Sequence, residues 1–231
     1  MKILITAITL CFAMIAEAIA KPEEPRASKK PTQTSSTPSA LSHHSPKIMQ
    51  LVKHGISKEA LKKGLEAHAW AIKKHAVPKK NLLTIVDFSL PSNERRFFVI
   101  DLDQQALIMK EYTSQGSGSG RGTMATAFSD AEGSHESVTG VMLTKDTYYG
   151  KHGKSLRLSG LEKRDINVAQ RDIVIHSAYY VTPHFINHYH RAGNSWGCFA
   201  LDPAVTGSVI DRLKDGSILF SYAPDVSFDY R

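Results

Sequence analysis

Seven short runs rich in apolar and β-branched residues follow Asn81 and constrain the fold most strongly. They cover residues 82–88, 96–102, 106–112, 138–143, 156–158, 172–176 and 217–222. Pro91-Ser92-Asn93 and Asp103-Gln104-Gln105 are typical turn sequences, and the second predicts a hairpin between 96–102 and 106–112. Each run has the length of a strand rather than that of a helix. The pattern therefore predicts a mainly antiparallel β domain over residues 81–231.

Helices are expected to be few and short within this domain. Residues 183–190 and 203–213 each begin with a proline, which favours the first turn of a helix. Thr182 and Asp202 precede the prolines and are suitable N-caps. The domain is thus mainly β with short helices, in the α+β class.

Residues 48–80 predict a helical extension before the β domain. Apolar residues recur there at three- and four-residue spacing, and Ser57 is a suitable N-cap. Gly55 separates a short helix from a longer one that runs to about Lys74, and Val77-Pro78 ends it. Helices packed against the main domain are the simplest interpretation.

The first 47 residues have the features of a signal peptide and a tether. Residues 1–20 combine Lys2, an apolar stretch and Ala18-Ile19-Ala20, a typical signal-peptidase site. Residues 21–47 are rich in Pro, Ser, Thr and Lys, which predicts a disordered tether. The chain is therefore expected to be exported, to a periplasm or cell envelope.

Charge and cysteine content narrow the function further. The net charge is +7, which favours contact of the basic tether with an anionic wall polymer or membrane surface. Export and the lack of a basic stripe interleaved with aromatics argue against nucleic acid. Cys11 leaves with the signal peptide, so Cys198 remains as a single thiol, which points to a reactive residue or an intermolecular bridge. No obligate protein partner is expected.

Residues 175–201 carry the most chemistry. His176 ends the apolar run 173–175, and Cys198 follows the small-residue turn Ser195-Trp196-Gly197. An imidazole and a thiol brought together by the fold form a base and a nucleophile. Gly197 allows the substrate to approach the backbone closely, and amides around the turn are candidate donors to an oxyanion.

These residues resemble the catalytic core of the YkuD-like L,D-transpeptidases, cysteine enzymes of the bacterial cell wall. The matching elements are Ile175-His176-Ser177 and Ser195-Trp196-Gly197-Cys198-Phe199. A tryptophan before Gly-Cys indicates a particular subfamily, and the resemblance covers about 95–222. Further matching segments are 97–102, 148–153, 155–158 and 160–162.

The resemblance implies a fold and a reaction. The fold is an antiparallel β sandwich or barrel. Cys198 attacks the third residue of a tetrapeptide stem with His176 as base, releases D-alanine and passes the thioester to an amine as a 3-3 crosslink. It implies no cofactor and no metal. The resemblance also implies that a backbone carbonyl near Ser177 orients the base. It groups Ser177 with the residues of the oxyanion turn. Residues implied to line the donor pocket are Tyr149, His152 and Arg157.

The sequence departs from the family pattern in three places. Ser177 replaces the usual glycine, and Ala200 stands where Arg or Asn is common. The gap between His176 and Cys198 is also longer, and residues 183–190 are the expected insertion. The second departure leaves the choice of donor open.

Several alternatives remain at this stage. Water as acceptor gives an L,D-carboxypeptidase, and transfer to a wall-anchored protein is a further family possibility. A non-catalytic wall-binding protein would tolerate loss of Cys198. His184, His188 and His190 suggest a zinc hydrolase, although no Glu follows in the H-E-x-x-H manner. A papain-like protease has Cys before His, and the glycines of 116–122 fit a mobile loop better than a phosphate loop.

Overall fold

The computed structural model describes residues 45–230. The predicted signal peptide, most of the tether and His43-His44 lie outside the described residues. Within residues 45–230, no helix has both the length and the apolar character needed to cross a membrane.

The helical extension forms much as predicted. It consists of α1 (Pro46–Met49), the 3-10 helix η1 (Gln50–His54) and α2 (Lys58–Lys74). Gly55 separates η1 from α2 with a left-handed φ of 93°, and the Ser57 hydroxyl caps α2 by accepting from the Ala60 amide at 3.2 Å.

Eight strands form one mixed sheet. Its order is β3-β2-β1-β10-β5-β6-β7-β9, and its strands are β1 (Leu82–Asp87), β2 (Phe97–Asp101), β3 (Ala106–Glu111), β5 (Gly140–Gly150), β6 (Gly153–Gly160), β7 (Val174–Ser177), β9 (Phe199–Leu201) and β10 (Ile218–Tyr222). Two pairs, β1 with β10 and β7 with β9, are parallel, and the others are antiparallel. Parallel pairs need long crossovers. The connection from β7 to β9 supplies one through η3 (Tyr179–Val181) and α3 (Pro183–Tyr189).

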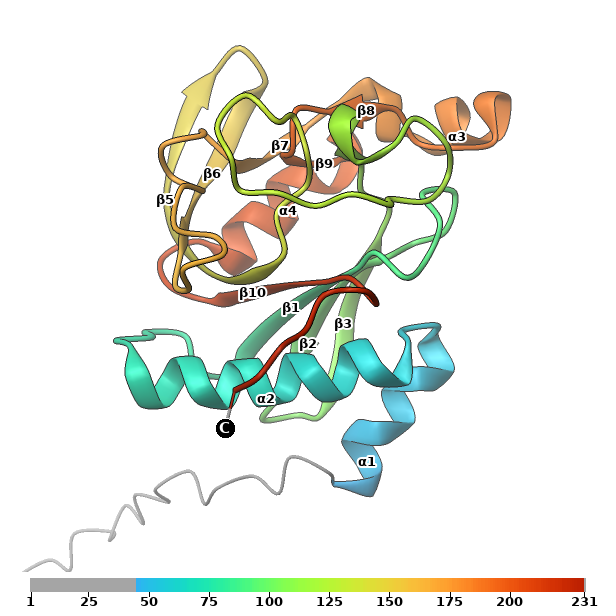
Figure 1. Cartoon of the computed structure of the whole chain (residues 1–231). Helices are drawn as coiled ribbons and strands as arrows, with labels where there is room; N and C mark the ends of the chain where they lie inside the picture. The colour runs from blue at the N-terminus through green and yellow to red at the C-terminus, as the bar shows by residue number, and fades with distance from the viewer. Residues whose placement is uncertain (1–44, 231) are drawn as a thin grey trace, which may run out of the picture. The chain divides into compact units, whose positions relative to one another are not determined.

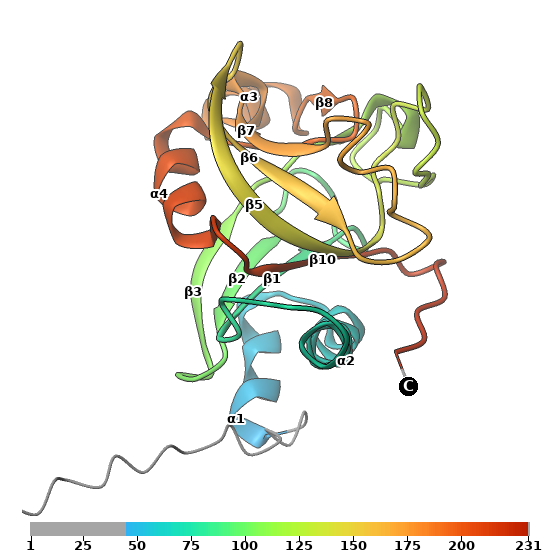
Figure 2. The ribbon, with the colours of Figure 1, turned by 90° about the vertical axis from the view of Figure 1, so that its left-hand side faces the viewer.

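Two hydrophobic cores lie on opposite faces of β1, β2 and β10. Ile85, Phe98 and Phe220 face α2, which covers one side of these strands (Figure 1). Gly64 allows this close approach, because a Cβ there would lie 2.5 Å from Ile85 Cδ1. The other face packs against β7, β9 and α4 (Pro203–Leu213), as β5 and β6 curve over it (Figure 2). The sheet thus encloses a core in the manner of a sandwich, and the fold is mostly β with short helices.

Three segments differ from the sequence prediction. β5 and β6 form a hairpin that reaches the turn at Lys151-His152, well beyond 138–143 and 156–158, because strand pairing continues where the apolar pattern stops. β9 was not predicted, although its three residues are all buried. Part of 116–122 is also structured, as β4 (Gln115–Gly116) pairs with β8 (Asn194–Ser195) and runs into η2 (Ser117–Ser119).

A buried arginine holds together the segments next to the β4–β8 pair. Arg96 donates to the carbonyls of Leu90 and Thr113 and to Gln115 Oε1, at 2.9–3.2 Å. Burial lowers the pKa of its guanidinium to about 9. The Gln115 amide in turn donates to three carbonyls of residues 120–124. This network fixes β4, which pairs with β8, and β8 leads directly into the Ser-Trp-Gly-Cys turn.

Stability is expected to fall as pH rises because of Asp165, in the loop after β6. Asp165 is fully buried, and its Oδ2 has no hydrogen-bond partner among the described residues. Burial raises its pKa from 3.8 to about 8, although the Glu162 amide donates to Oδ1 at 2.7 Å. Between these two pH values the native state binds a proton that the unfolded state has released. One such proton lowers stability by at most about 1.4 kcal/mol per pH unit.

Urea unfolding at pH 5 and pH 8 tests this expectation. Asp165→Asn should reduce the loss of stability between the two pH values, whereas the exposed Asp103→Asn should not. An equal loss in wild type and Asp165→Asn would show that the folded protein does not hold Asp165 protonated between pH 5 and pH 8.

Candidate active site

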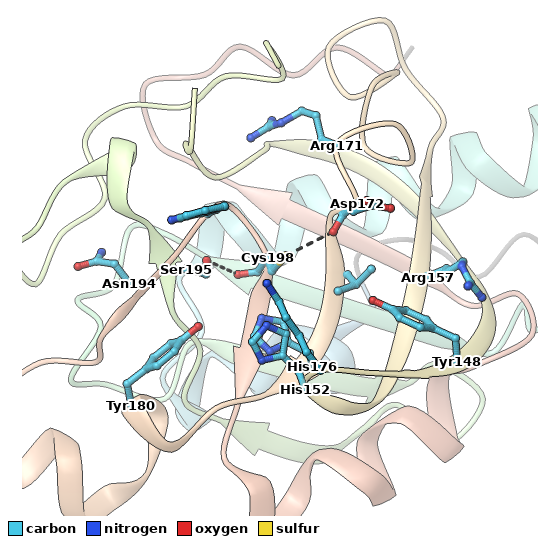
Figure 3. A pocket seen from close by; sticks show the side chains of 13 residues that line it. Tyr148, His152, Arg157, Arg171, Asp172, His176, Tyr180, Asn194, Ser195 and Cys198 are labelled. Atoms are coloured by element: carbon cyan, nitrogen blue, oxygen red, sulfur yellow. Dashed lines mark hydrogen bonds between the residues drawn. The ribbon is translucent and has the colours of Figure 1, made fainter. Parts of the chain in front are cut away.

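A cavity of about 580 Å³ lies where β7 meets the segment before β9 (Figure 3). This volume is that of a typical small-ligand site. Its lining comes from the β5–β6 hairpin, β7 and the two residues 171–172, η3 and the Ser-Trp-Gly-Cys turn. The lining residues are Tyr148, Lys151, His152, Arg157, Arg171, Asp172, Val174, His176, Tyr180, Asn194, Ser195, Trp196 and Cys198.

Strand pairing brings His176 and Cys198 into this cavity. β7 and β9 are parallel, with Ile175 opposite Phe199 and His176 opposite Ala200. Alternate residues face the same side, so Ile175 and Phe199 enter the core while His176 faces the cavity. Cys198 directly precedes β9, and its side chain reaches the same cavity.

The Cys198 thiol is free and partly accessible. It donates to the backbone carbonyl of Asp172, with Sγ 3.4 Å from the oxygen. Burial raises the thiol's pKa above its usual 9.0, against the opposing effects of the Val174 amide and the Arg171 charge. The resting form is therefore the thiol, and reaction requires a base.

His176 has the properties of a neutral base. It is 3% exposed, and its Nδ1 lies 2.9 Å from the carbonyl oxygen of Ser177. That contact fits the tautomer in which Nδ1–H donates and Nε2 keeps a lone pair. The structure thus has the backbone carbonyl that the resemblance implied. Burial lowers the pKa of His176 below 6.5, and the nearby His152 and Lys151 lower it further.

The side chain of Ser177 contacts the β5–β6 hairpin, and a role of Ser177 at the Ser-Trp-Gly-Cys turn stays a prediction. Its hydroxyl donates to the carbonyl of His152 at 2.9 Å. The rings of His152 and His176 stack with centroids 4.3 Å apart. The serine that replaces the family's glycine therefore fixes the tip of the hairpin beside the base.

The Ser-Trp-Gly-Cys turn is closed by Ser195. Its hydroxyl accepts from the Gly197 amide at 3.1 Å and donates to the Cys198 carbonyl at 2.7 Å. Gly197 has φ 110°, and a Cβ there would lie 2.6 Å from the Glu136 carbonyl oxygen, so the turn requires glycine. Since the Gly197 amide is already bonded, it is not a free oxyanion donor as predicted. Trp196 is 69% exposed and stacks on His135, with ring centroids 4.6 Å apart.

Two of the three residues predicted for the donor pocket line the cavity, and Tyr149 does not. His152 and Arg157 are among the lining residues. Tyr149 is 82% exposed and lies outside the lining, whereas Tyr148 belongs to it. Successive residues of a strand face opposite sides, so the choice between neighbouring tyrosines depends on the register of β5. Tyr149 therefore lies outside the cavity, and Tyr148 is the tyrosine of this strand that lines it. A contact of Tyr149 with the substrate stays a prediction.

A model of a known protein family matches most of the chain. The model of the L,D-transpeptidase catalytic domain matches residues 52–222. The chain belongs to this family. The match is wider than the segment 95–222 that carries the resemblance, and it includes α2. No curated protein matches the chain.

Solved structures similar to this chain include three L,D-transpeptidases. The enzyme from Mycobacterium smegmatis is 14% identical with a TM-score of 0.39, over 62% of this chain and 59% of that chain. L,D-transpeptidase 1 of Mycobacterium tuberculosis is 12% identical with a TM-score of 0.35, over 62% of each chain. The L,D-transpeptidase of Xylanimonas cellulosilytica is 12% identical with a TM-score of 0.34, over 69% of this chain and 77% of that chain. The chain thus spans about three fifths of the length of the first two.

Besides Tyr148 and the strand residue Val174, the structure adds five polar residues to the site of this family member. They are Lys151, Arg171, Asp172, Tyr180 and Asn194. Sequence signals existed for the first three: Lys151 lies inside the matching segment 148–153, and Arg171-Asp172 precede the apolar run 173–175. Nothing local marked Tyr180 or Asn194, because only the crossover and the β4–β8 pairing bring them to the cavity. Burial raises the pKa of Tyr180 to about 12.

The described part of the chain contains no zinc site of the kind that a zinc hydrolase would need. Residues 45–230 contain no group of three or more His, Cys, Asp or Glu side chains arranged to hold a metal ion. His184 and His188 are on α3, and His190 follows it with a left-handed φ of 56°.

Proposed function

We propose that this protein is an acyltransferase that acts on peptidoglycan stem peptides through a Cys198 thioester, with His176 as the base. The observation that carries the proposal is the pairing of β7 with β9, which brings a free thiol and a neutral imidazole to one cavity in a chain of this family. Ser195, Trp196 and Gly197 shape the turn that presents the thiol.

The first half-reaction forms the thioester. The thiol turns away from the Asp172 carbonyl and gives its proton to His176 Nε2. The thiolate then attacks the carbonyl of the third stem residue, forming a C–S bond. As the tetrahedral intermediate collapses, the C–N bond breaks and His176 returns the proton to the departing nitrogen. D-Alanine leaves, and the tripeptide acyl group remains on Cys198.

The second half-reaction transfers the acyl group. An amine of a second stem gives His176 its proton and attacks the thioester, yielding a 3-3 crosslink and the free thiol. Water in the same position yields a tripeptide, the product of an L,D-carboxypeptidase. The neutral imidazole suits both steps, because it can accept a proton at neutral pH.

The proposed setting is outside the cytoplasm. The signal-like residues 1–20 and the basic, Pro- and Ser-rich residues 21–47 are consistent with export to a periplasm or cell envelope and with contact with an anionic wall.

The decisive experiment supplies purified residues 21–231 with a defined disaccharide-tetrapeptide and reads the products by mass spectrometry. We expect D-alanine release together with dimers that lack one D-alanine. Tripeptide without dimers would make water the acceptor and the protein a carboxypeptidase. Unchanged tetrapeptide would contradict the proposal and favour a wall-binding protein.

A further inference from the structure

The cavity contains more positive than negative side chains. Among the described residues that line it, Lys151, Arg157 and Arg171 are cations and Asp172 is the acid. The lowered pKa of His152 and of His176 keeps both imidazoles neutral at pH 7. Such a site favours a ligand that carries a carboxylate, and the contacts of the three cations decide which of them is available.

Arg171 is fully engaged with the protein. Its side chain is 3% exposed and forms an ion pair with Asp130. Nη1 donates to the Ser129 carbonyl at 2.6 Å and Nη2 to the Glu136 carbonyl at 2.8 Å. These bonds hold the loop that packs against Gly197. Arg171 therefore supports the turn and has little capacity for a substrate.

Arg157, which sequence reasoning placed in the donor pocket, is also occupied. Its guanidinium forms an ion pair with Asp146, with Nη1 2.6 Å from Oδ2. It also lies over the Tyr148 ring, 4.3 Å from the centroid. The neighbouring carboxylate offsets its charge, so a substrate carboxylate at Arg157 would have to compete with Asp146.

Lys151 is exposed and available. No hydrogen bond or ion pair engages its ammonium within residues 45–230. It occupies the two-residue turn of the hairpin, between the paired Gly150 and Gly153. The bond from Ser177 to the His152 carbonyl anchors this turn to β7. Lys151 lines the same cavity as His176 and Cys198, and its charge lowers the pKa of both groups.

The proposed donor has a carboxylate close to its reacting bond. D-Alanine is the leaving group, and its carboxylate carbon is two bonds from the nitrogen of the scissile amide. A cation that recognises it must lie beside the thiol and the base. A lysine there binds the carboxylate as a point charge with three donors.

We propose that Lys151 binds the terminal carboxylate of the donor tetrapeptide and so selects stems that end in a free D-alanine. This inference rests on the proposed function and specifies how its donor is chosen. Ser177, on β7, supports the position of Lys151, because its hydrogen bond to the His152 carbonyl fixes the turn that carries Lys151.

The test compares two probes, the tetrapeptide with a free carboxylate and its C-terminal amide. Calorimetry in the Cys198→Ala background measures binding without turnover. We expect Lys151→Met to weaken binding of the acid by about 10-fold or more and to leave binding of the amide unchanged. Lys151→Arg should keep most of the preference. Lys145→Met, which removes an exposed lysine of the same hairpin, should change neither affinity.

Arg157→Met tests whether Arg157, rather than Lys151, binds the carboxylate. D-Alanine release is then measured for the Lys151 and Arg157 variants that keep Cys198. Lys151→Met should raise KM for the acid more than it lowers kcat. If it releases D-alanine with an unchanged preference for acid over amide, or if Arg157→Met removes that preference, Lys151 is not the anchor and the proposed function stands. If the wild-type protein releases no D-alanine, both proposals fail.

Discussion

Replacing Cys198 by alanine is expected to abolish D-alanine release from a disaccharide-tetrapeptide, by a factor on the order of 10⁴ or more. Loss of a catalytic nucleophile has effects of this size in enzymes with covalent intermediates. Cys198→Ser should also be nearly inactive, because a serine hydroxyl is far less acidic than a thiol. Mass spectrometry of the products at matched protein concentrations measures both effects.

The control for Cys198→Ala is its stability and wall binding. Cys198 lies at the cavity and outside the main hydrophobic cores, so the variant should unfold close to the wild-type midpoint. Intact-mass spectra of the wild type with substrate should show a tripeptide adduct that is absent from the variant. A variant that keeps D-alanine release would exclude the thioester mechanism, and one that keeps wall binding while the wild type has no activity would favour a binding protein.

Local sequence signals were sufficient to predict elements whose boundaries depend on neighbouring residues alone. α4 begins at Pro203 and ends at Leu213 as predicted, because Asp202 caps it through the Ala204 amide at 2.9 Å. β1, β2 and β10 are buried along their whole length, so their sequences are largely apolar. The mixed topology had no such signal. The placement of β10 beside β1 is a contact between distant segments, decided by the two cores they share.

The site residues likewise fall into those that local motifs predict and those that long-range contacts place. Cys198 and His176 were recognised because each stands at the end of a distinctive segment, a small-residue turn or an apolar run. The other cavity residues depend on long-range contacts that no short motif records. The hairpin is the clearest case: its polar half extends from the sheet to the cavity and delivers Tyr148, Lys151 and His152. Two of the predicted groups already have partners within the protein for a similar reason: Asp146 forms an ion pair with Arg157, and the Ser195 hydroxyl accepts from the Gly197 amide.

His176→Ala is expected to lower kcat/KM at pH 7 by about 10²- to 10⁴-fold, the usual contribution of a general base. In the wild type, kcat/KM should fall on the acid side at a pKa below 6.5, because the buried His176 must be neutral to accept the thiol proton. In His176→Ala that acid limb should disappear. The residual rate should instead rise with pH toward the pKa of Cys198, which lies above 9.0, as thiolate forms without a base.

His152→Ala tests whether the acid limb of the pH profile reports the protonation of His176. His152 stacks on His176 and disfavours its protonation, so its removal should move the acid limb upward toward pH 6.5. The measurement is a kcat/KM profile from pH 5 to 9 for the wild type and both variants. If His176→Ala keeps the wild-type acid limb, another group titrates there, and His176 is not the base.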